Sequence, residues 1–169
     1  MRNVKEVIIE GVTLEKIIES HNQWLLNEGG KQACLCGVDL SDVDLRGVCL
    51  RRADLHGSNL RDSDISEADL RGARIEYSDL RDVTAYNALL DNAVAHNAKF
   101  DYSNLEGASM ICICADGASF YHANMVAVKL KKGIVGGCMR HCDLSLADLR
   151  DVDLSDVDFS HSNLYGMKK

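Results

Sequence analysis

Apolar side chains recur at every fifth position over most of the chain. Steps of five residues from Leu35 to Val135 meet an apolar residue each time, including Leu40, Leu60, Leu80, Phe100 and Phe120. A small or β-branched side chain stands two residues earlier, as Ala53 does before Leu55. A period of five fits neither the 3.6 of a helix nor the 2.0 of a simple strand. It predicts a backbone that turns a corner every five residues, with two side chains inside and three outside.

The period slips once, by one residue. After Val135 the apolar series resumes at Met139 and continues to Leu164, which gives 21 units before the slip and 6 after it. The slip falls in Gly133-Ile-Val-Gly-Gly137, and glycine adopts the backbone angles that a shortened corner needs. We expect one side of the coil to be a residue short and the coil to be uninterrupted. We expect it to persist also through 84–99, where the consensus is weakest.

Asp or Asn often stands between the small and the large apolar residue, as in Ala53-Asp54-Leu55 and Ser103-Asn104-Leu105. This pattern resembles the pentapeptide-repeat family, whose consensus is Ala-Asp/Asn-Leu-x-x, over about four-fifths of the chain. The resemblance implies an all-β solenoid, a right-handed quadrilateral β-helix with four units per coil. Residues twenty apart then lie above one another, and at about 4.8 Å per coil the rod is roughly 30 Å long.

The ends of the rod differ. Residues 1–30 are predicted to form an N-terminal strand and a capping α-helix, and residues 31–169 the pentapeptide-repeat β-helix, as a single compact unit. Thr13 is the predicted N-cap, Gly29-Gly30 the predicted helix stop, and residues 4–9 a short strand beside the first coil. The apolar face of the helix carries Leu14, Ile17, Ile18, His21 and Leu25.

After Leu164 only five residues remain, too few to cap the last coil. An uncovered apolar end with free strand edges favours pairing with another chain. We therefore expect a homodimer that meets through its C-terminal coils. The residues expected in this interface are Phe159, Leu164, Tyr165 and Met167.

Composition narrows the class of protein. Of 169 residues, 46% are hydrophobic and 27% charged, which is typical neither of a disordered chain nor of a membrane protein. No apolar run approaches the roughly 20 residues of a membrane span, and the N-terminus does not resemble a signal peptide. The expected location is the cytoplasm. The 7 cysteines include no Cys-x-x-Cys pair, which favours reduced thiols without a disulfide.

Candidate catalytic and metal-binding residues are explained by the repeat. No nucleophile elbow, phosphate-binding glycine loop or His-Glu-x-x-His motif is present, and a filled coil leaves no pocket. His122, His141 and His161 fall in one column with Asp42, Asp62, Asp82 and Tyr102. This column could hold a metal ion, but parallel side chains at a fixed spacing are poorly placed to coordinate the same ion. We predict no enzyme, no catalytic residue, no cofactor and no metal site.

Acidic residues gather on one side of the early coils, namely Asp39, Asp42, Asp62, Asp79 and Asp82. We expect this side to bind a protein partner, with no direct binding of nucleic acid or membrane. The favoured function is a non-catalytic, rigid protein–protein interaction module.

The alternative comes from the resemblance, since some family members bind DNA gyrase by imitating DNA and confer quinolone resistance. Duplex DNA carries about 18 charges over such a length, whereas the whole chain has a net charge of −7. By this comparison the chain is a poor charge mimic of DNA.

Overall fold

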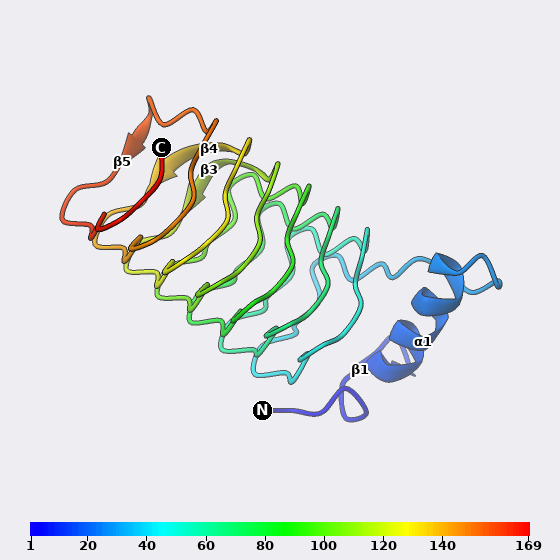
Figure 1. Cartoon of the computed structure of the whole chain (residues 1–169). Helices are drawn as coiled ribbons and strands as arrows, with labels where there is room; N and C mark the ends of the chain where they lie inside the picture. Colours follow the sequence, from blue (N-terminus) through cyan, green and yellow to red (C-terminus); the bar gives the residue numbers. More distant parts are fainter.

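The chain folds into a rod of stacked coils with a helix at one end (Figure 1). The computed structural model describes residues 1–169, with the exception of the side chain of Ile134. The elements in chain order are β1 (Ile8–Ile9), β2 (Val12–Thr13), α1 (Leu14–Leu25), β3 (Cys114–Ser119), β4 (Ile134–Cys138) and β5 (Val157–Asp158). Helix α1 lies at one end of the rod and the C-terminus at the other (Figure 1).

Residues twenty apart lie side by side as parallel pairs. Parallel bridges join Asp39 to Asn59, Asn59 to Asp79 and Asp79 to Lys99. The Leu40 N–H donates to the Asn59 carbonyl at 2.7 Å, and the Asn59 N–H donates to the Val38 carbonyl at 3.0 Å. Separate ladders begin at Cys34, Asp39, Asp44 and Cys49, which gives four sides. The predicted fold class, a right-handed four-sided β-helix, is confirmed, and the ladders continue through 84–99.

The inside of the coil is filled by the two inward positions of each unit. Leu40, Leu60 and Leu80 are fully buried, as are most of the small residues two positions before the large ones, such as Ala53. The rings of Phe100 and Phe120 stack with centroids 5.0 Å apart and planes 1° from parallel. Side chains from successive coils therefore pack directly on one another, as close-packed protein interiors require.

The fifth residue of the unit forms the corner in a left-handed conformation. This position has φ of 55° at Asp42, 58° at Tyr77 and 59° at His122, and 64° at Gly57. Such a conformation costs a residue with a Cβ about 1–2 kcal/mol. The corner nevertheless recurs because it brings the next inward pair into register with the coil below.

The slip lies where the glycines predicted it. β3 pairs in parallel with β4, and the pairing changes from Asp116 with Gly136 to Ala118 with Gly137. Before this point partners are 20 residues apart, and beyond it Asn124 pairs with Asp143, 19 residues away. Gly137 has φ of 132°. A Cβ there would lie 2.4 Å from the Ala118 carbonyl oxygen, so the shortened side requires glycine.

The N-terminal segment differs from the prediction in two details. Ile8–Ile9 pairs with Val12–Thr13 in a hairpin, and Arg2 makes the bridge to the first coil, opposite Val43. The strand expected at 4–9 beside the first coil was therefore wrong in its extent and its pairing, although Val7 of this segment is buried in the core. Thr13 is the N-cap, as predicted, but the helix ends at Leu25 because Asn27 takes the left-handed conformation (φ 59°) before the glycines are reached.

The last coil has no coil beyond it. Inward residues of the middle coils are fully buried, whereas their counterparts Leu154 and Phe159 are only half-buried. Leu164 is 36% exposed and Tyr165 77% exposed. No helix among the described residues is long and apolar enough to cross a lipid bilayer.

Candidate functional site

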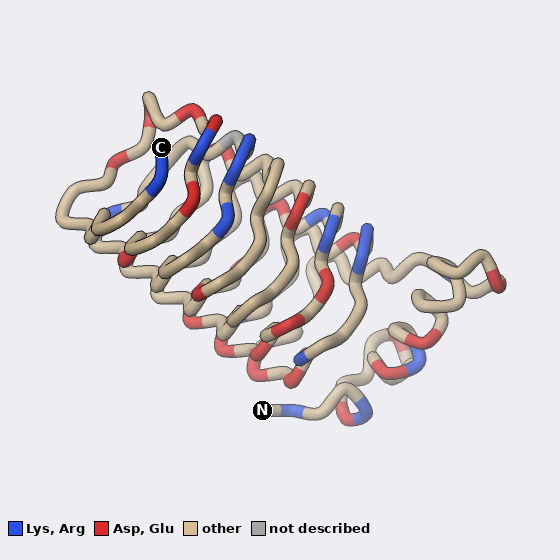
Figure 2. Tube along the Cα trace, viewed as in Figure 1, with Lys and Arg blue, Asp and Glu red and all other residues tan. Residues whose placement is uncertain are grey.

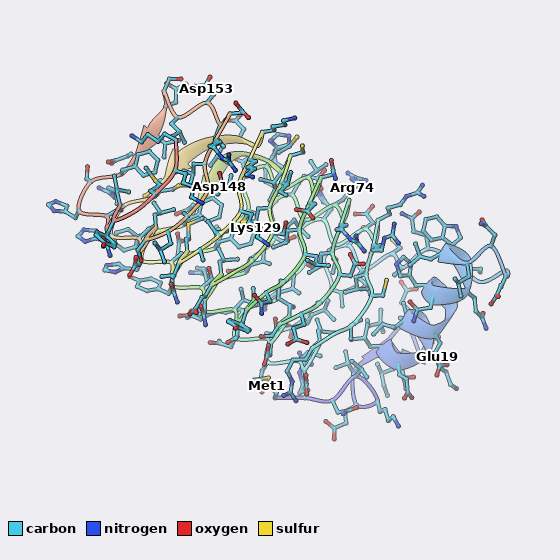
Figure 3. The ribbon with its side chains drawn as sticks, viewed as in Figure 1. Met1, Glu19, Arg74, Lys129, Asp148 and Asp153 are labelled. Carbon is cyan, nitrogen blue, oxygen red and sulfur yellow. The ribbon has the colours of Figure 1, made fainter. Side chains whose placement is uncertain are left out.

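One side of the rod carries both the acidic residues and the histidines that the sequence singled out. We call it the Leu40 face, because its inward series begins at Leu40. Side chains project outward from every coil (Figure 3). The outward residues of the Leu40 face form three columns along the rod. These columns are Asp39, Asn59, Asp79, Lys99, Ser119, Cys138 and Asp158; Ser41, Arg61, Arg81, Asp101, Tyr121, Arg140 and Ser160; and Asp42, Asp62, Asp82, Tyr102, His122, His141 and His161.

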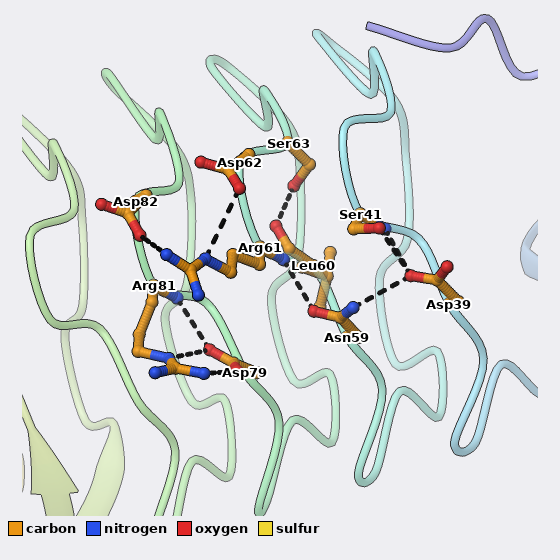
Figure 4. Close-up of polar contacts among 10 residues, drawn as sticks. All are labelled: Asp39, Ser41, Asn59, Leu60, Arg61, Asp62, Ser63, Asp79, Arg81 and Asp82. Carbon is orange, nitrogen blue, oxygen red and sulfur yellow. Dashed lines mark hydrogen bonds and ion pairs between the residues drawn. The ribbon is translucent and has the colours of Figure 1, made fainter.

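The five acidic residues lie on the early coils of this face, and Figure 4 shows all of them except Asp42. Asp39 accepts hydrogen bonds from the Ser41 hydroxyl at 2.7 Å and from the Asn59 amide at 3.0 Å. Asp42 lies 3.2 Å from the N-terminal ammonium of Met1. The sequence therefore grouped these residues correctly, because the twenty-residue step defines neighbours along a column.

Arginines on the same face pair with the remaining acids. The Arg61 guanidinium lies between two carboxylates, 3.5 Å from Asp62 and 3.0 Å from Asp82 (Figure 4). Arg81 holds Asp79 with two bonds, Nε at 2.8 Å and Nη2 at 2.5 Å. Hydrogen bonds from Ser41 lower the pKa of Asp39, and the Arg81 guanidinium lowers the pKa of Asp79.

The pairing changes what the acidic residues present to a partner. Both Lys/Arg and Asp/Glu positions occur on the early coils, as Figure 2 shows, and Arg61 and Arg81 lie among the acids of the Leu40 face. Exposed ion pairs of this kind contribute only about 0–1 kcal/mol to stability. Their effect at the surface is to fix the side chains in a mixed pattern of donors and acceptors, unlike the continuous anionic stripe of a nucleic acid.

The C-terminal half of the face is an aromatic and imidazole ladder. The rings of Tyr102 and His122 stack at 5.3 Å, His122 and His141 at 4.8 Å, and His141 and His161 at 4.9 Å. Tyr121 stands edge-on to His122, with centroids 4.4 Å apart and planes at 84°. The Arg140 guanidinium lies 5.7 Å from the Tyr121 ring. Tyr102 is 56% exposed, so this ladder is an accessible surface.

The stacked rings are poorly arranged for a metal. Their planes differ by only 13° and 18°, so their nitrogens do not point to one centre. Over the part of the chain that the structure describes, no three His, Cys, Asp or Glu side chains are grouped to hold an ion. Partial burial lowers the pKa of His141, and the neighbouring His122, His161 and Arg140 charges lower it further. His141 is therefore mainly neutral at pH 7.

The proposed dimer residues lie at the open end of the rod. Phe159 and Met167 are half-buried, and Leu164 and Tyr165 are exposed. His161 continues the ladder to the same end, since it stacks on His141. The end of the rod and the Leu40 face are thus continuous.

Two features of the site were not predicted from the sequence. Tyr121 and Arg140 were not named, although the twenty-residue step from Arg81 and Asp101 leads to them once the slip is allowed for. The structure also has a cavity of about 430 Å³ where α1 meets the first coil, lined in part by Cys34 and Cys36. The period could not predict it, because it describes the coils and not how the helix docks on them.

Comparisons with known proteins agree on one family. A family model for pentapeptide repeats matches 8 copies, at residues 39–76, 78–111 and 136–166. No curated protein matches the sequence. Among solved structures, alr5209, a pentapeptide repeat protein from Nostoc PCC 7120, aligns at a TM-score of 0.52 with 23% identity, over 60% of this chain and 78% of that one. The likeness is one of fold.

Two further structures align less closely. HetL, a pentapeptide repeat protein involved in heterocyst differentiation regulation in Nostoc sp. strain PCC 7120, has a TM-score of 0.44 and 21% identity, over 82% of this chain and 77% of that one. QnrB1, a plasmid-mediated fluoroquinolone resistance protein, has a TM-score of 0.47 and 16% identity, over 76% of this chain and 78% of that one.

Proposed function

Since the chain belongs to the pentapeptide-repeat family, we propose that it is a non-catalytic, rigid interaction module that binds a protein partner through the Leu40 face. The observation that carries the proposal is the exposed cluster of Tyr102, Tyr121, His122 and Arg140. Tyrosine and arginine are enriched among the residues that dominate protein–protein binding energy.

Rigidity supports the same role. The rings of the ladder are held by their neighbours and by a backbone that is hydrogen-bonded on both sides. A partner therefore meets side chains that are already ordered, which reduces the entropy lost on binding. The paired acids beside the ladder, Asp62, Asp79 and Asp82 among them, form the polar part of the proposed surface.

The filled interior supports a role without catalysis. The inward residues of the middle coils are fully buried, so the coil offers no internal site for a substrate. We place the protein in the cytoplasm, because its seven cysteines are free and reduced thiols persist there.

The alternative, a DNA-mimic modulator of gyrase or another topoisomerase, is less well supported. The negative charge of its strongest candidates, the five acids of the early coils, is partly offset by Arg2, Arg61, Arg81 and the N-terminus. A supercoiling assay separates the two proposals. We expect no change in gyrase activity at excess protein, with or without a quinolone, whereas inhibition or protection of gyrase would favour the mimic.

Affinity capture from the source cells tests the interaction module. Tagged wild-type protein is compared with a double variant of the ladder, Tyr102→Asn with Tyr121→Ser. The control is Asn92→Ser with Lys132→Asn, two exposed corner positions on the opposite side of the rod. We expect a partner that the wild type and the control retain and that the ladder variant loses. Equal retention by all three would contradict binding through this face.

A further inference from the structure

Two cysteine sulfurs lie in contact at the N-terminal end of the rod. Cys34 and Cys36 flank the inward residue Leu35, so both side chains point outward from the same side of the coil. Their Sγ atoms are 3.5 Å apart, and both residues are exposed. The coil fixes the backbone between them, because the Leu35 N–H donates to the Asp54 carbonyl at 2.6 Å and the Gly37 N–H to the His56 carbonyl at 2.9 Å.

A second Cys-x-Cys sequence shows that spacing alone does not produce this contact. Cys112 is a corner residue with φ of 58°, and Cys114 belongs to the next side of the coil. Within the described part of the chain, no hydrogen bond or sulfur contact joins these two side chains. The corner turns the two thiols away from each other, whereas Cys34 and Cys36 lie on one straight segment.

The thiol pair opens into the cavity of about 430 Å³ between α1 and the first coil. The apolar wall of the cavity is formed by Ile9, Val12, Ile17 and Val38. Its charged lining residues are Lys16, Lys31 and Glu10. A small group held by the two sulfurs would therefore find both apolar contacts and cations beside it.

We propose that Cys34 and Cys36 chelate a soft, thiophilic ion whose third coordination position faces this cavity. Soft thiolate ligands select ions such as Cu(I). For bonds of about 2.3 Å to each sulfur, a gap of 3.5 Å corresponds to an angle of about 100° at the ion. This bent arrangement suits a three-coordinate centre, trivalent arsenic as well as Cu(I), and leaves one position for a ligand from solution.

Harder ions lack the donors that they need here. A structural zinc site uses four protein ligands. In the part of the chain covered by the structure, no third His, Cys, Asp or Glu side chain joins the pair in a metal-holding group. The ion is consequently exchangeable, and its remaining ligand comes from outside the chain.

The binding reaction releases protons from both sulfurs. A trivalent arsenoxide forms two As–S bonds, and its oxygen leaves as water with the two thiol protons. Cu(I) displaces the same two protons to solvent, so its binding strengthens as the pH rises.

Phenylarsine oxide is the first probe, because its phenyl group can enter the cavity. Intact-mass spectrometry of the folded full chain counts the adducts in the presence of excess glutathione, a monothiol. We expect one retained adduct per chain, which a competing dithiol removes. Cys34→Ser and Cys36→Ser, tested separately, should each weaken retention by roughly a hundredfold, because only one sulfur remains.

The double variant Cys112→Ser with Cys114→Ser is the matched control and should retain the adduct as the wild type does. Competition with a coloured Cu(I) chelator forms the second arm and should give the same ranking of variants. Circular dichroism confirms that each variant is folded. The proposal is overturned if the wild type holds no adduct against glutathione, or if the control loses the adduct while Cys34→Ser keeps it.

Discussion

At the scale of single residues, the corner position carries a conformational free-energy cost that recurs along the repeat. Nearly every unit ends in a left-handed residue, and many of these are not glycine, including Tyr77, Leu146 and Lys132. A Cβ in this conformation is disfavoured by about 1–2 kcal/mol. This strain is offset because the backbone N–H and C=O groups that follow the corner then form hydrogen bonds with the neighbouring coils.

Two reciprocal substitutions test this cost. Gly57 has φ of 64° and nothing within 4 Å of an added Cβ, so Gly57→Ala changes only the backbone preference. Ala127 has φ of 55° and is exposed, so Ala127→Gly removes only a methyl group. We expect Gly57→Ala to lower the free energy of unfolding by about 1 kcal/mol and Ala127→Gly to raise it by up to about 1 kcal/mol.

Urea denaturation followed by circular dichroism measures both changes. Gly in the unfolded chain has more freedom than Ala, which reduces the two effects without changing their signs. Shifts of the same sign in the two variants would contradict the account of the corners.

The residue scale also shows what the sequence can predict. The columns follow from the period alone, so the grouping of Asp62 with Asp82 and of His122 with His141 was predictable. The period does not predict two other contacts, the bidentate hydrogen bonds of Arg81 to Asp79 and the contact between the Cys34 and Cys36 sulfurs. These contacts depend on side-chain rotamers across outward positions, which the repeat leaves free.

At the scale of elements, the helix cap is the part least determined by the repeat. His21 of α1 is fully buried, its Nδ1 accepts a hydrogen bond from the Ala33 N–H at 3.0 Å, and its ring stacks on Trp24 at 5.6 Å. The sequence pattern predicted that His21 lies on the apolar face of the helix, but it did not predict a hydrogen-bond partner for the ring. Its partner is the first residue of the rod, twelve positions away, which only docking brings close.

The burial of His21 predicts a dependence of stability on pH. Burial lowers its pKa below the usual value of about 6.5, so below that pH the unfolded state binds more protons than the folded state. The unfolding free energy should therefore fall as the pH drops below about 6.5. The ring also faces Trp24, which carries the Arg52 guanidinium, and a backbone hydrogen bond with Arg51 opposes the larger effect of burial on the pKa.

His21→Gln provides the comparison, because glutamine accepts the same hydrogen bond but does not titrate. We expect it to be less stable than the wild type at pH 7.5, since the ring stacking is lost. Its stability should decline less between pH 7.5 and pH 5. Fluorescence of Trp24, the single tryptophan, follows unfolding at this junction. Identical declines in the two proteins would refute the assignment.

The slip at Gly133–Gly137 is the other element-level feature. The spacing of apolar residues located it correctly, because the large inward position cannot be missing without exposing the core. Which residue has no partner was beyond the sequence: the structure assigns this to Gly117, opposite the change from Gly136 to Gly137.

At the scale of the whole molecule, the two ends of the rod are unequal. The hairpin β1–β2 and α1 cover the N-terminal coil, whereas the C-terminal coil leaves Leu164 and Tyr165 exposed. We expect the chain to dimerise through this end, with Phe159 and Met167 becoming more buried. Exposed apolar surface and unpaired strand edges both favour such pairing.

Sedimentation velocity at micromolar concentration measures the association. The wild type should sediment as a dimer and Leu164→Lys with Tyr165→Lys as a monomer. Tyr77→Lys, at a similarly exposed aromatic residue in the middle of the rod, should remain a dimer. A monomeric wild type would contradict the prediction.

The central claim is that one side of this rod, the Leu40 face, binds the partner. A photoreactive benzophenone amino acid is placed in cells at one outward position per side of a single coil: Asp116, Tyr121, Val126 or Lys131, each directly after an inward residue. The account predicts a cross-linked partner from position 121 and none from the other three. Cross-links of equal yield from all four sides, or from a side other than that of Tyr121, would contradict it.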